Sequence, residues 1–358
     1  MRIGVLTGGG DCPGLNAVIR AVFKTSFNNG WDVIGIEDGF EGLLDPTKSV
    51  FLSPEKIHGI LPLGGTILGT SNMPDPFEQS LNDPTLRSSV EKPTNMLKNI
   101  QELGLNAVIA IGGDGTLTIS QGLFQMGGPL IGIPKTIDND IPGTDVTLGF
   151  RTAVETVTQA LDRLHSTAES HHRIFVVEVM GRYGGWIALE AGMAGGADII
   201  LIPEIPFEME KIQEKIQSQF EKGRKCCLIV VAEGSKPLGG GMSVLKKSES
   251  GYVLRLEGVG KKVGEEISRK TGKDVRVTVL GHLQRGGSPC SFDRILGTRF
   301  GTAAIELIKE GGFGKMVCLK TPHITSVPLQ EAVKELKTVP PHGGLVNSAE
   351  ALGISLGR

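Results

Sequence analysis

Residues 3–20 read IGVLTGGGDCPGLNAVIR, and this stretch indicates the fold. A short apolar run leads into three consecutive glycines, and a segment with helical spacing of apolar residues follows. Backbone N–H groups in such a turn can converge on an anion at the N-terminus of the helix. The stretch carries neither the Gly-Lys-Ser/Thr of a P-loop nor the usual dinucleotide-binding spacing. It therefore predicts a strand, a glycine turn and a helix, used either for phosphate binding or simply as a tight turn.

The same order recurs along the chain, where short runs rich in Val and Ile alternate with amphipathic segments. Such runs are typical of parallel sheets covered on both faces. We predict strands at Ile3–Thr7, Val33–Ile36, Ala107–Ile111, Leu130–Ile133, Ile174–Val179, Ile199–Ile202, Cys227–Ala232, Arg276–Leu280 and Met316–Leu319. We predict helices at about Leu15–Phe27, Lys92–Leu103, Leu117–Met126, Val146–His165, Ile187–Met193, Glu208–Glu221, Val259–Lys270, Arg294–Lys309 and Ser348–Leu352. Residues 239–251 are expected to form a loop-like surface insertion. The fold class is α/β with two mainly parallel sheets.

Composition narrows the class of protein. A length of 358 residues suggests about two domains. The 37 Lys and Arg against 39 Asp and Glu give a net charge of −2, so nothing favours nucleic acid or an anionic membrane as a partner. No apolar run is long enough to span a bilayer or to serve as a signal peptide. The five cysteines show neither metal nor disulfide spacing. We expect a cytoplasmic protein.

A second glycine turn lies in residues 107–120, AVIAIGGDGTLTIS. Asp114 could cap the helix that follows. A carboxylate beside a phosphate-binding turn can also hold Mg²⁺ through water, and we favour this metal role. The short GGDG string occurs in NAD kinases and diacylglycerol kinases too. It indicates a site for a phosphate donor without naming the acceptor.

A third strand ends in charge, because residues 130–140 read LIGIPKTIDND. A turn rich in Asp and Asn would explain Asn139 and Asp140. It would not explain Lys135 and Thr136, which come directly after the apolar run. We therefore expect this strand to end at a ligand site, where charge is tolerated.

The motifs GGGDCPGLNAVIR, IGGDGT, PKTIDND, HHR, VEVMGR and GHLQRGGSP occur in this order. Together they resemble the 6-phosphofructokinase family across nearly the whole chain. The resemblance implies two Rossmann-like three-layer α/β/α domains with the active site in the cleft between them. It implies transfer of a phosphoryl group from Mg-ATP to the 1-hydroxyl of fructose 6-phosphate in glycolysis. Residues 1–148 with about 283–333 would form the large donor domain that includes the catalytic loop, and residues 149–282 with about 334–358 the smaller sugar-phosphate domain.

The resemblance also assigns roles. Asp138 would be the base for the attacking hydroxyl, as a carboxylate within hydrogen-bond reach can be. Lys135, Thr136 and Arg182 would act on the transferring phosphoryl group, and Asp140 would hold the loop in shape. ATP would contact Gly10, Asn72, Met73, Gly113, Asp114, Gly115 and Thr116, with Asp114 on the magnesium. Sugar phosphate would contact Thr136, Asp138, Arg173, Met180, Gly181, Arg182, Glu233, Arg276, His282 and Arg285.

In the family, the residues matching Arg173 and Arg276 reach the active site of a neighbouring subunit. The resemblance therefore implies a homo-oligomer, specifically a homotetramer built as a dimer of dimers. Nothing in the bare sequence adds to that implication.

The phosphoryl donor depends on three positions. Pyrophosphate enzymes of the family carry an aspartate where this chain has Gly115, and an acid there would crowd and repel the α-phosphate of ATP. Lys135 resembles pyrophosphate enzymes and also one ATP-using subgroup. Asn72 stands where many members have an arginine on the donor phosphates, and Lys135 could compensate for it. We predict ATP, with pyrophosphate as the alternative donor.

Two other functions remain as alternatives. A non-catalytic sensor of nucleotide or sugar phosphate would keep the same fold, but Asp138 and Asp114 are both present. An NAD-linked dehydrogenase could use the first glycine turn with Glu37 or Asp38 on the ribose. That reading leaves PKTIDND and HLQRGG unexplained.

Overall fold

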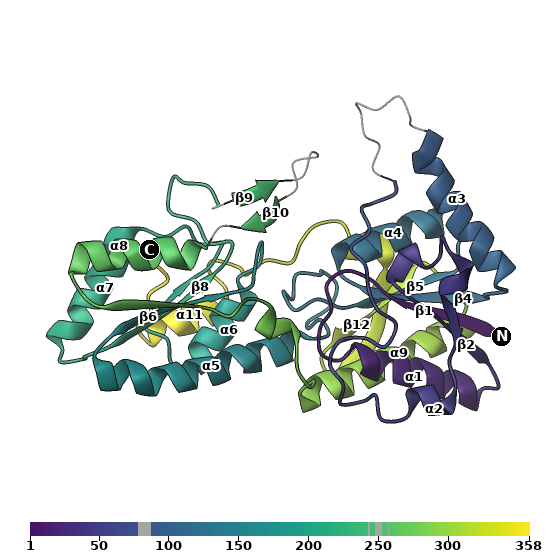
Figure 1. The fold of residues 1–358 in the computed structure, drawn as a ribbon, viewed down its shortest axis with the longest axis horizontal. Coiled ribbons are helices and arrows are strands. Elements are labelled where there is room, and N and C mark those ends of the chain that lie inside the picture. Colours follow the sequence, from purple (N-terminus) through teal and green to yellow (C-terminus); the bar gives the residue numbers. More distant parts are fainter. Residues whose placement is uncertain (78–86, 243, 248–252, 257) are drawn as a thin grey trace. The chain divides into compact units, whose positions relative to one another are not determined.

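The structure is a computed structural model and describes residues 1–77, 87–242, 244–247, 253–256 and 258–358 (Figure 1). The chain divides into two compact units. Unit 1 contains Met1–Ile137, Ile141–Thr152 and Arg285–Leu336, and unit 2 contains Asp138–Asp140, Ala153–Gln284 and Lys337–Arg358. Each unit has its own mainly parallel sheet with helices on both faces, which confirms the predicted α/β fold class.

Unit 1 is built on a seven-stranded sheet of order β13-β12-β5-β4-β1-β2-β3. Its strands are β1 (Arg2–Thr7), β2 (Asp32–Ile36), β3 (Ser49–Phe51), β4 (Ala107–Gly112), β5 (Leu130–Pro134), β12 (Lys315–Lys320) and β13 (His323–Pro328). The five inner strands pair in parallel, and β3 and β13 close the two edges in antiparallel pairing. The carboxyl ends of β1, β4 and β5 therefore lie at one end of this sheet, where ligands bind in open parallel sheets.

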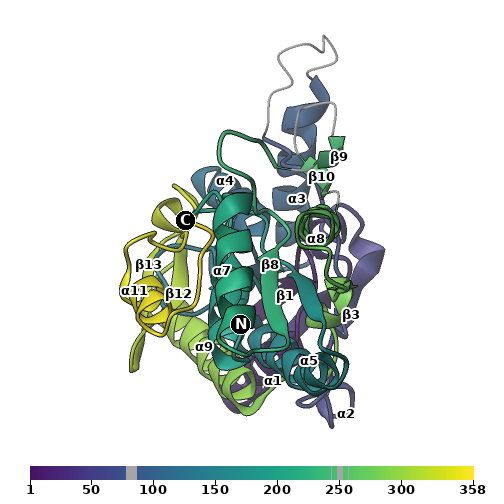
Figure 2. The ribbon, with the colours of Figure 1, turned by 90° about the vertical axis from the view of Figure 1, so that its left-hand side faces the viewer.

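Helices cover both faces of the unit 1 sheet. On one face, α1 (Leu15–Asn28) and α9 (Ser291–Lys309) lie side by side (Figure 2), and a Cβ at Gly301 would meet that of Ala21 at 2.7 Å. Glycine at this position lets the two helices pack closely. On the other face, α3 (Arg87–Glu102) and α4 (Asp114–Gln125) bury Met96, Ile100 and Leu123 against the strands. The short helices α2 (Pro54–Ile57) and α10 (Leu329–Ala332) and the 3₁₀ turns η1 (Gly39–Glu41) and η2 (Pro46–Lys48) complete the unit.

Unit 2 contains a four-stranded parallel sheet of order β11-β6-β8-β7. Its strands are β6 (Ile174–Val179), β7 (Ile199–Leu201), β8 (Cys227–Ala232) and β11 (Val275–Val279), and its helices are α5 (Phe150–His171, which begins in unit 1), α6 (Trp186–Ala194), α7 (Met209–Glu221), α8 (Val259–Thr271) and α11 (Gly344–Ala351). Helices α7 and α8 bury Ile212, Ile216 and Val263 against the sheet in one apolar cluster. The 3₁₀ turn η3 (Gly281–Arg285) follows β11 and joins the two units in the chain.

The last residues of the chain add to the same sheet. Ser355 forms a parallel bridge with Ile199 of β7, and the N–H of Ile200 donates to the carbonyl of Ser355 at 2.9 Å. The β7 edge is therefore covered by the C-terminal residues. The opposite edge strand, β11, leaves Val277 and Val279 exposed.

Several sequence predictions need correction. Helices α3 and α11 begin at Arg87 and Gly344, four to five residues before their predicted starts, and the edge strands β3 and β13 were not predicted. Residues 239–251 are not all loop, since β9 (Val244–Lys247) pairs antiparallel with β10 (Val253–Leu256); residues 243 and 248–251 lie outside the described part of the chain. Helix α5 begins at Phe150 and not at Val146, because Gly149 has a φ of +93° and Asp293 accepts the N–H groups of Gly149 and Thr152 at 2.9 and 2.8 Å. These bonds cap the start of the helix.

None of the described helices is both long and apolar enough to cross a bilayer.

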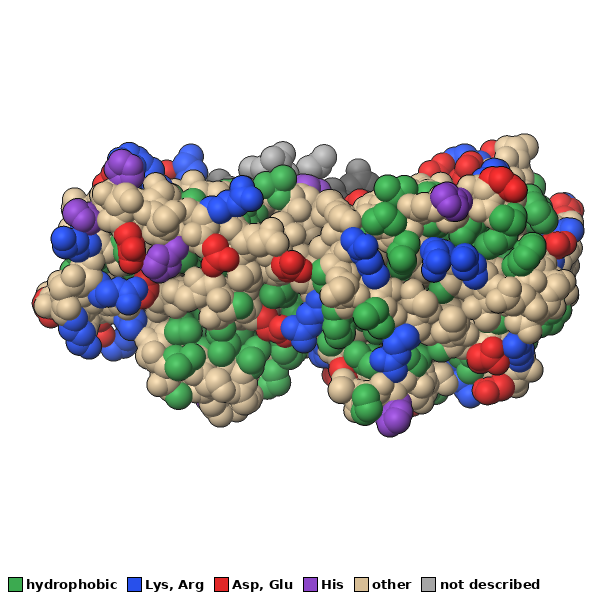
Figure 3. All heavy atoms as spheres, turned by 90° about the horizontal axis from the view of Figure 1, so that it is seen from below, with side chains coloured by type: hydrophobic (Ala, Val, Ile, Leu, Met, Phe, Trp, Pro, Cys, Tyr) green, Lys and Arg blue, Asp and Glu red, His purple; other side chains and the backbone are tan. Residues whose placement is uncertain are grey.

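Figure 3 shows positive and negative side chains mixed over one face of the molecule, in keeping with the net charge of −2. The near-neutral net charge gives no reason to expect a broad basic field, so we expect any phosphate group to be bound by local groups.

Candidate active site

The first glycine turn follows β1 directly. Gly9 has a φ of +77°, and its N–H donates to the carbonyl of Ser71 at 2.9 Å. The N–H of Gly8 donates to the carbonyl of Ile111 in the neighbouring strand at 3.0 Å. Gly14, with a φ of +111°, then begins α1. The turn needs glycine because L-residues rarely adopt these φ values.

The second glycine turn lies against the first, because β1 and β4 are parallel neighbours. Thr116, buried at the start of α4, fills the space between them: a Cβ at Gly8 would meet its Oγ1 at 2.6 Å, and one at Gly112 at 2.3 Å. A Cβ at Gly115 would have no neighbour within 4 Å. Larger residues are therefore excluded at Gly8 and Gly112 by the fold, whereas Gly115 is open toward the pocket that it lines.

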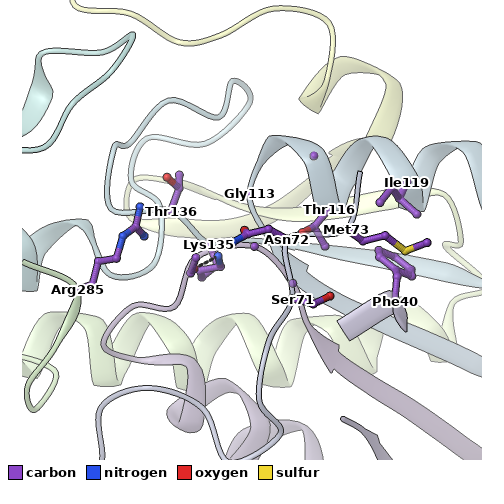
Figure 4. A pocket seen from close by; sticks show the side chains of 14 residues that line it. Phe40, Ser71, Asn72, Met73, Gly113, Thr116, Ile119, Lys135, Thr136 and Arg285 are labelled. Atoms are coloured by element: carbon purple, nitrogen blue, oxygen red, sulfur yellow. Dashed lines mark hydrogen bonds between the residues drawn. The ribbon is translucent and has the colours of Figure 1, made fainter. Parts of the chain in front are cut away.

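These turns form the floor of a pocket in unit 1 (Figure 4). Lys135, Thr136 and Arg285 lie at one end, and the apolar side chains of Phe40, Met73 and Ile119 lie at the other. The lining residues are Gly8, Gly9, Gly10, Phe40, Ser71, Asn72, Met73, Gly113, Gly115, Thr116, Ile119, Lys135, Thr136 and Arg285. The pocket thus has a cationic end and an apolar end on one glycine-rich floor.

Two cations contact the first glycine turn. Lys135 is only 2% exposed, and its Nζ donates to the carbonyl of Gly10. Arg285 donates from Nη1 to the carbonyl of Asp11 at 3.2 Å, and a Cβ at Gly10 would meet that Nη1 at 2.5 Å. The two positive charges therefore lie beside the backbone of Gly10, which has no side chain to keep a ligand away from them.

Asp114 stands at the first position of α4, between two residues that line the pocket. Its side chain is exposed, yet the surrounding chain still raises the pKa of its carboxyl by desolvation. Among the described residues, no cluster of three or more His, Cys, Asp or Glu could hold a metal. Mg²⁺ commonly uses one or two carboxylates together with substrate phosphates and water, so this single carboxylate fits a magnesium ion shared with a polyphosphate.

The segment Pro134–Asp140 changes unit within its length, between Ile137 and Asp138. Its first half extends the unit 1 sheet: Lys135 donates its N–H to the carbonyl of Gly112 at 2.9 Å and forms a bridge with Leu148. Thr147 donates from Oγ1 to the carbonyl of Thr136 at 2.6 Å. Backbone pairing therefore fixes Lys135 and Thr136 beside the pocket.

The second half belongs to unit 2. Asn139 is buried and has a φ of +52°. Its Oδ1 accepts a hydrogen bond from Nζ of Lys337 at 3.0 Å, and the carbonyl of Asp140 accepts the N–H of Lys337 at 2.7 Å. Asp138 precedes this turn, and its side chain is partly exposed.

Within unit 2, several predicted sugar-phosphate residues gather at the carboxyl ends of β6 and β8. Gly181 has a φ of +128° and accepts the N–H of Gly234 at 3.1 Å, which holds Met180–Arg182 next to Glu233. The N–H of Met180 donates to Oε1 of Gln284 at 3.2 Å, and Gln284 is fully buried. His282, two residues before Gln284 on η3, is exposed.

Arg173 and Arg276 lie at the other end of the same sheet. Arg173 comes just before β6, and Arg276 pairs in register with Phe175 near its start. Met180 lies seven positions after Arg173, which corresponds to about 23 Å along an extended strand. Both guanidinium groups contact Asp274, at 2.6 Å from Nε of Arg173 and 3.2 Å from Nη1 of Arg276. The structure thus separates these two arginines from Met180–Arg182.

Sequence reasoning did not find Gln284 and Lys337, which hold Met180 and the turn after Asp138, nor Asp274, which holds Arg173 and Arg276. It also did not find Glu204, whose carboxylate accepts the N–H of Gly185 at the start of α6. Gln284 lay within the quoted GHLQRGGSP motif, so its position carried a signal. Lys337 lies in a segment without any motif, and no pattern in the sequence pointed to it. The place of Arg285 at the cationic end of the pocket was also not anticipated, since it was assigned to the sugar phosphate.

Comparisons with known proteins show the family and the fold. A family model described as phosphofructokinase matches residues 2–308. The ATP-dependent 6-phosphofructokinase of Chloroflexus aggregans is 52% identical over 356 residues, which cover 99% of this chain and 98% of the relative. The structure of phosphofructokinase from Saccharomyces cerevisiae matches with a TM-score of 0.78 and 32% identity over 99% of this chain, which spans 46% of the yeast chain. The structure of the pyrophosphate-dependent phosphofructokinase from Nitrosospira multiformis matches with a TM-score of 0.81 and 20% identity. The match covers 99% of this chain and 92% of the Nitrosospira chain and shows a similar fold.

Proposed function

The chain belongs to the phosphofructokinase family, and from this premise we propose how its residues divide the work of the reaction. The activity is that of an ATP-dependent 6-phosphofructokinase, which transfers a phosphoryl group from ATP to the 1-hydroxyl of fructose 6-phosphate in glycolysis. The names of the relatives confirm the prediction of ATP as donor. One observation carries our assignment of roles: two glycine turns and two cations line a single pocket beside the charged segment Pro134–Asp140.

Unit 1 binds the donor in this proposal. The polyphosphate lies over the glycine turns at the cationic end, and the base lies toward Phe40, Met73 and Ile119 at the apolar end. Gly10, Gly113 and Thr116 supply backbone and side-chain contacts, and Gly115 leaves room for the α-phosphate. Asp114 would hold Mg²⁺, which neutralises phosphate charge when bound. Asn72 contacts the phosphates as a neutral group.

Lys135 and Thr136 act on the transferring phosphoryl group. Phosphoryl transfer depends mostly on positioning and on stabilising charge in the transition state. A buried ammonium group is effective for this purpose, because a water-poor site strengthens its attraction to a phosphate. Lys135 replaces the missing arginine at position 72 as the cation for the donor phosphates.

Unit 2 binds the sugar phosphate in this proposal. Asp138 accepts the proton of the attacking 1-hydroxyl, so the alkoxide forms as the bond to phosphorus develops. Met180 and Gly181 line the sugar, Glu233 accepts a sugar hydroxyl, and Arg182 faces both the sugar and the transferred phosphate. Their common place at the ends of β6 and β8 supports this grouping.

The 6-phosphate is bound by His282, Arg173 and Arg276, the last two coming from a neighbouring subunit. Arg285, which the sequence assigned to the sugar phosphate, lines the cationic end of the donor pocket in unit 1 and faces the donor phosphates in this proposal. Within one chain, Arg173 stands about 23 Å along β6 from Met180, which is farther than an arginine side chain can reach. A homo-oligomer, which we propose to be a homotetramer, would bring the two arginines to the site of another copy.

Hybrid oligomers test this sharing of arginines between subunits. Arg276→Ala chains and Asp138→Asn chains, each inactive alone, should regain activity when they are mixed and reassembled. Mixtures that stay inactive despite forming oligomers would argue that each chain uses its own arginines.

A direct assay tests the assignment. Purified protein with Mg²⁺ and fructose 6-phosphate is given ATP or pyrophosphate in parallel, and fructose 1,6-bisphosphate is measured. We expect product with ATP and little with pyrophosphate. Product formed with pyrophosphate but not with ATP would overturn the assignment of ATP as the donor. No product with either donor would reject the kinase assignment in favour of a non-catalytic sensor.

A further inference from the structure

The turn that follows Asp138 is held in an unfavourable backbone conformation. Asn139 lies in the left-handed region with a φ of +52°, and only 3% of its surface is exposed. Asn tolerates this region better than most residues, but a single left-handed residue still needs contacts that hold it there. The direction of the preceding residue, Asp138, depends on how firmly this turn is fixed.

Lys337 contacts the turn from a part of the chain 198 residues away. Its N–H donates to the carbonyl of Asp140 at 2.7 Å, and its Nζ donates to Oδ1 of Asn139 at 3.0 Å. A backbone bond and a side-chain bond from one residue thus bracket the last two residues of the segment. A hydrogen bond with a charged donor is stronger than one between neutral groups.

Lys337 is itself held against the first turn of α6. Nε1 of Trp186 donates to its carbonyl at 3.0 Å, and its Nζ lies 5.6 Å from the centre of the Trp186 ring. A Cβ at Gly184 would lie 3.2 Å from Trp186, 3.5 Å from the carbonyl oxygen of Asp138 and 3.7 Å from that of Lys337. These residues therefore form one packed junction.

The partly buried carboxylate of Glu204 ties the same segment to α6 a second time. Oε1 of Glu204 accepts the N–H groups of Val339 at 2.8 Å and of Gly185 at 3.0 Å. Gly185 caps α6, and the chain from Met180 to Arg182 comes just before it. Residues 337–339, which we call the strap, thus connect the Asp138 turn to the segment that binds the sugar in our proposal.

We propose that Lys337 is a positioning residue for the reaction: through Asn139 and Asp140 it holds the Asp138 carboxylate where it can accept the proton of the attacking sugar hydroxyl. This proposal rests on the role of Asp138 as the base. A base must lie within hydrogen-bond distance of the proton that it accepts, and a misplacement of about 1 Å can cost about 10²-fold in rate. Lys337 acts through the turn and not on the substrate.

The decisive test replaces the ammonium group and keeps the length of the chain. Lys337→Met should lower kcat by about 10- to 100-fold, while KM for fructose 6-phosphate and for ATP changes by less than about threefold. Lys337→Arg should recover much of the loss, since a guanidinium can also donate to Asn139. Lys334→Met, an exposed lysine three residues earlier, is the matched control and should behave as the unaltered protein.

Two further measurements separate positioning from general stability. Amide hydrogen exchange at residues 138–140 should be faster in Lys337→Met than in Lys334→Met, with the unit 1 pocket unchanged. The effects of Lys337→Met and Asn139→Gly on kcat should not add, because both remove the same hydrogen bond and glycine tolerates the left-handed φ at position 139. Asn139→Gly also provides the test if Lys337→Met fails to fold.

The outcomes distinguish this inference from the proposed function. If the unaltered protein makes no bisphosphate, the proposed function fails, and exchange at residues 138–140 alone then decides whether Lys337 holds the turn. If the unaltered protein is active and Lys337→Met matches Lys334→Met in kcat and in exchange, the positioning role is wrong. A raised KM with an unchanged kcat would also contradict the positioning role.

Discussion

The two halves of the segment Pro134–Asp140 are held by different means. Lys135 and Thr136 are fixed by backbone pairing with neighbouring residues of unit 1, including the bridge between Lys135 and Leu148. Asn139 and Asp140 are held by contacts from Lys337, 198 residues from Asn139. The donor half is thus part of a sheet, whereas the acceptor half is held by one backbone and one side-chain hydrogen bond from the distant residue Lys337.

This difference suggests a division of labour. A change in the donor half should alter the pocket and hence how the donor is bound and stabilised. A change in the acceptor half should alter the placement of one carboxylate and leave the pocket intact. The following variants test this comparison, beginning with the largest expected effect.

Removing the acceptor carboxylate should have the largest effect. Asp138→Asn keeps the shape of the side chain but cannot accept the proton of the hydroxyl, so kcat should fall by about 10²- to 10⁴-fold. Steady-state kinetics and a separate ATP-binding measurement should show ATP affinity changed by less than about threefold. A variant that retains more than about half of its turnover would show that Asp138 is not the base.

Removing the donor cation should come next. Lys135→Met keeps the volume of a buried side chain and loses its charge, so kcat should fall by about 10²-fold and KM for ATP should rise. Initial rates at varied ATP, with Lys334→Met as control, provide the measurement. Near-normal turnover would exclude a role for Lys135 on the phosphoryl group and leave the absence of an arginine at position 72 unexplained.

A substitution at Gly115 tests the donor half, because an added carboxylate there would crowd and repel the α-phosphate of ATP. A Cβ there has open space, so Gly115→Asp should fold normally and place its carboxylate in the pocket. We expect kcat/KM for ATP to fall by about 10- to 100-fold, and any activity with pyrophosphate to fall far less. Gly115→Ala serves as the control for size without charge. Equal losses with both donors would reject the account.

The smallest expected effect concerns the strap and its dependence on pH. Burial raises the pKa of the Glu204 carboxyl, against the hydrogen bonds from Val339 and Gly185 that lower it. A raised pKa means that the folded protein favours the protonated acid. Its contribution to stability is present at pH values below the unfolded pKa and is lost as pH rises through the folded value. The free energy of unfolding of Glu204→Gln minus that of the unaltered protein should therefore increase as pH rises from about 4, near the ordinary pKa of a Glu carboxyl, toward neutral pH. A difference that stays flat or moves the other way would contradict this account of Glu204.

The sequence predicted the parts of the molecule that local patterns determine. Glycine turns at Gly8–Gly10 and Gly112–Gly115 and the strands before them follow from apolar runs and from the conformational freedom of glycine. Lys135 was singled out because a charge at the end of a buried strand is unusual. Each of these signals lies within a few neighbouring residues.

The rest depends on contacts that no local pattern encodes. Asp293 caps the start of α5 although it lies 141 positions after Thr152 in the chain. A local pattern cannot show such a contact, so the predicted start of that helix is wrong. Lys337 carries no motif, and its importance appears only when Asn139 and Trp186 are seen beside it. Likewise, the register of β11 on β6 was needed to place Arg173 and Arg276 away from Met180.

Equilibrium binding of ATP and of fructose 6-phosphate, measured by calorimetry on Lys135→Met and Asp138→Asn, tests the central claim most directly. The account predicts that Lys135→Met weakens ATP binding by about tenfold or more and leaves the sugar phosphate bound as before, whereas Asp138→Asn binds both ligands within about threefold of the unaltered protein despite its lost turnover. If Asp138→Asn lost ATP binding while Lys135→Met kept it, the division between a donor half and an acceptor half would be wrong.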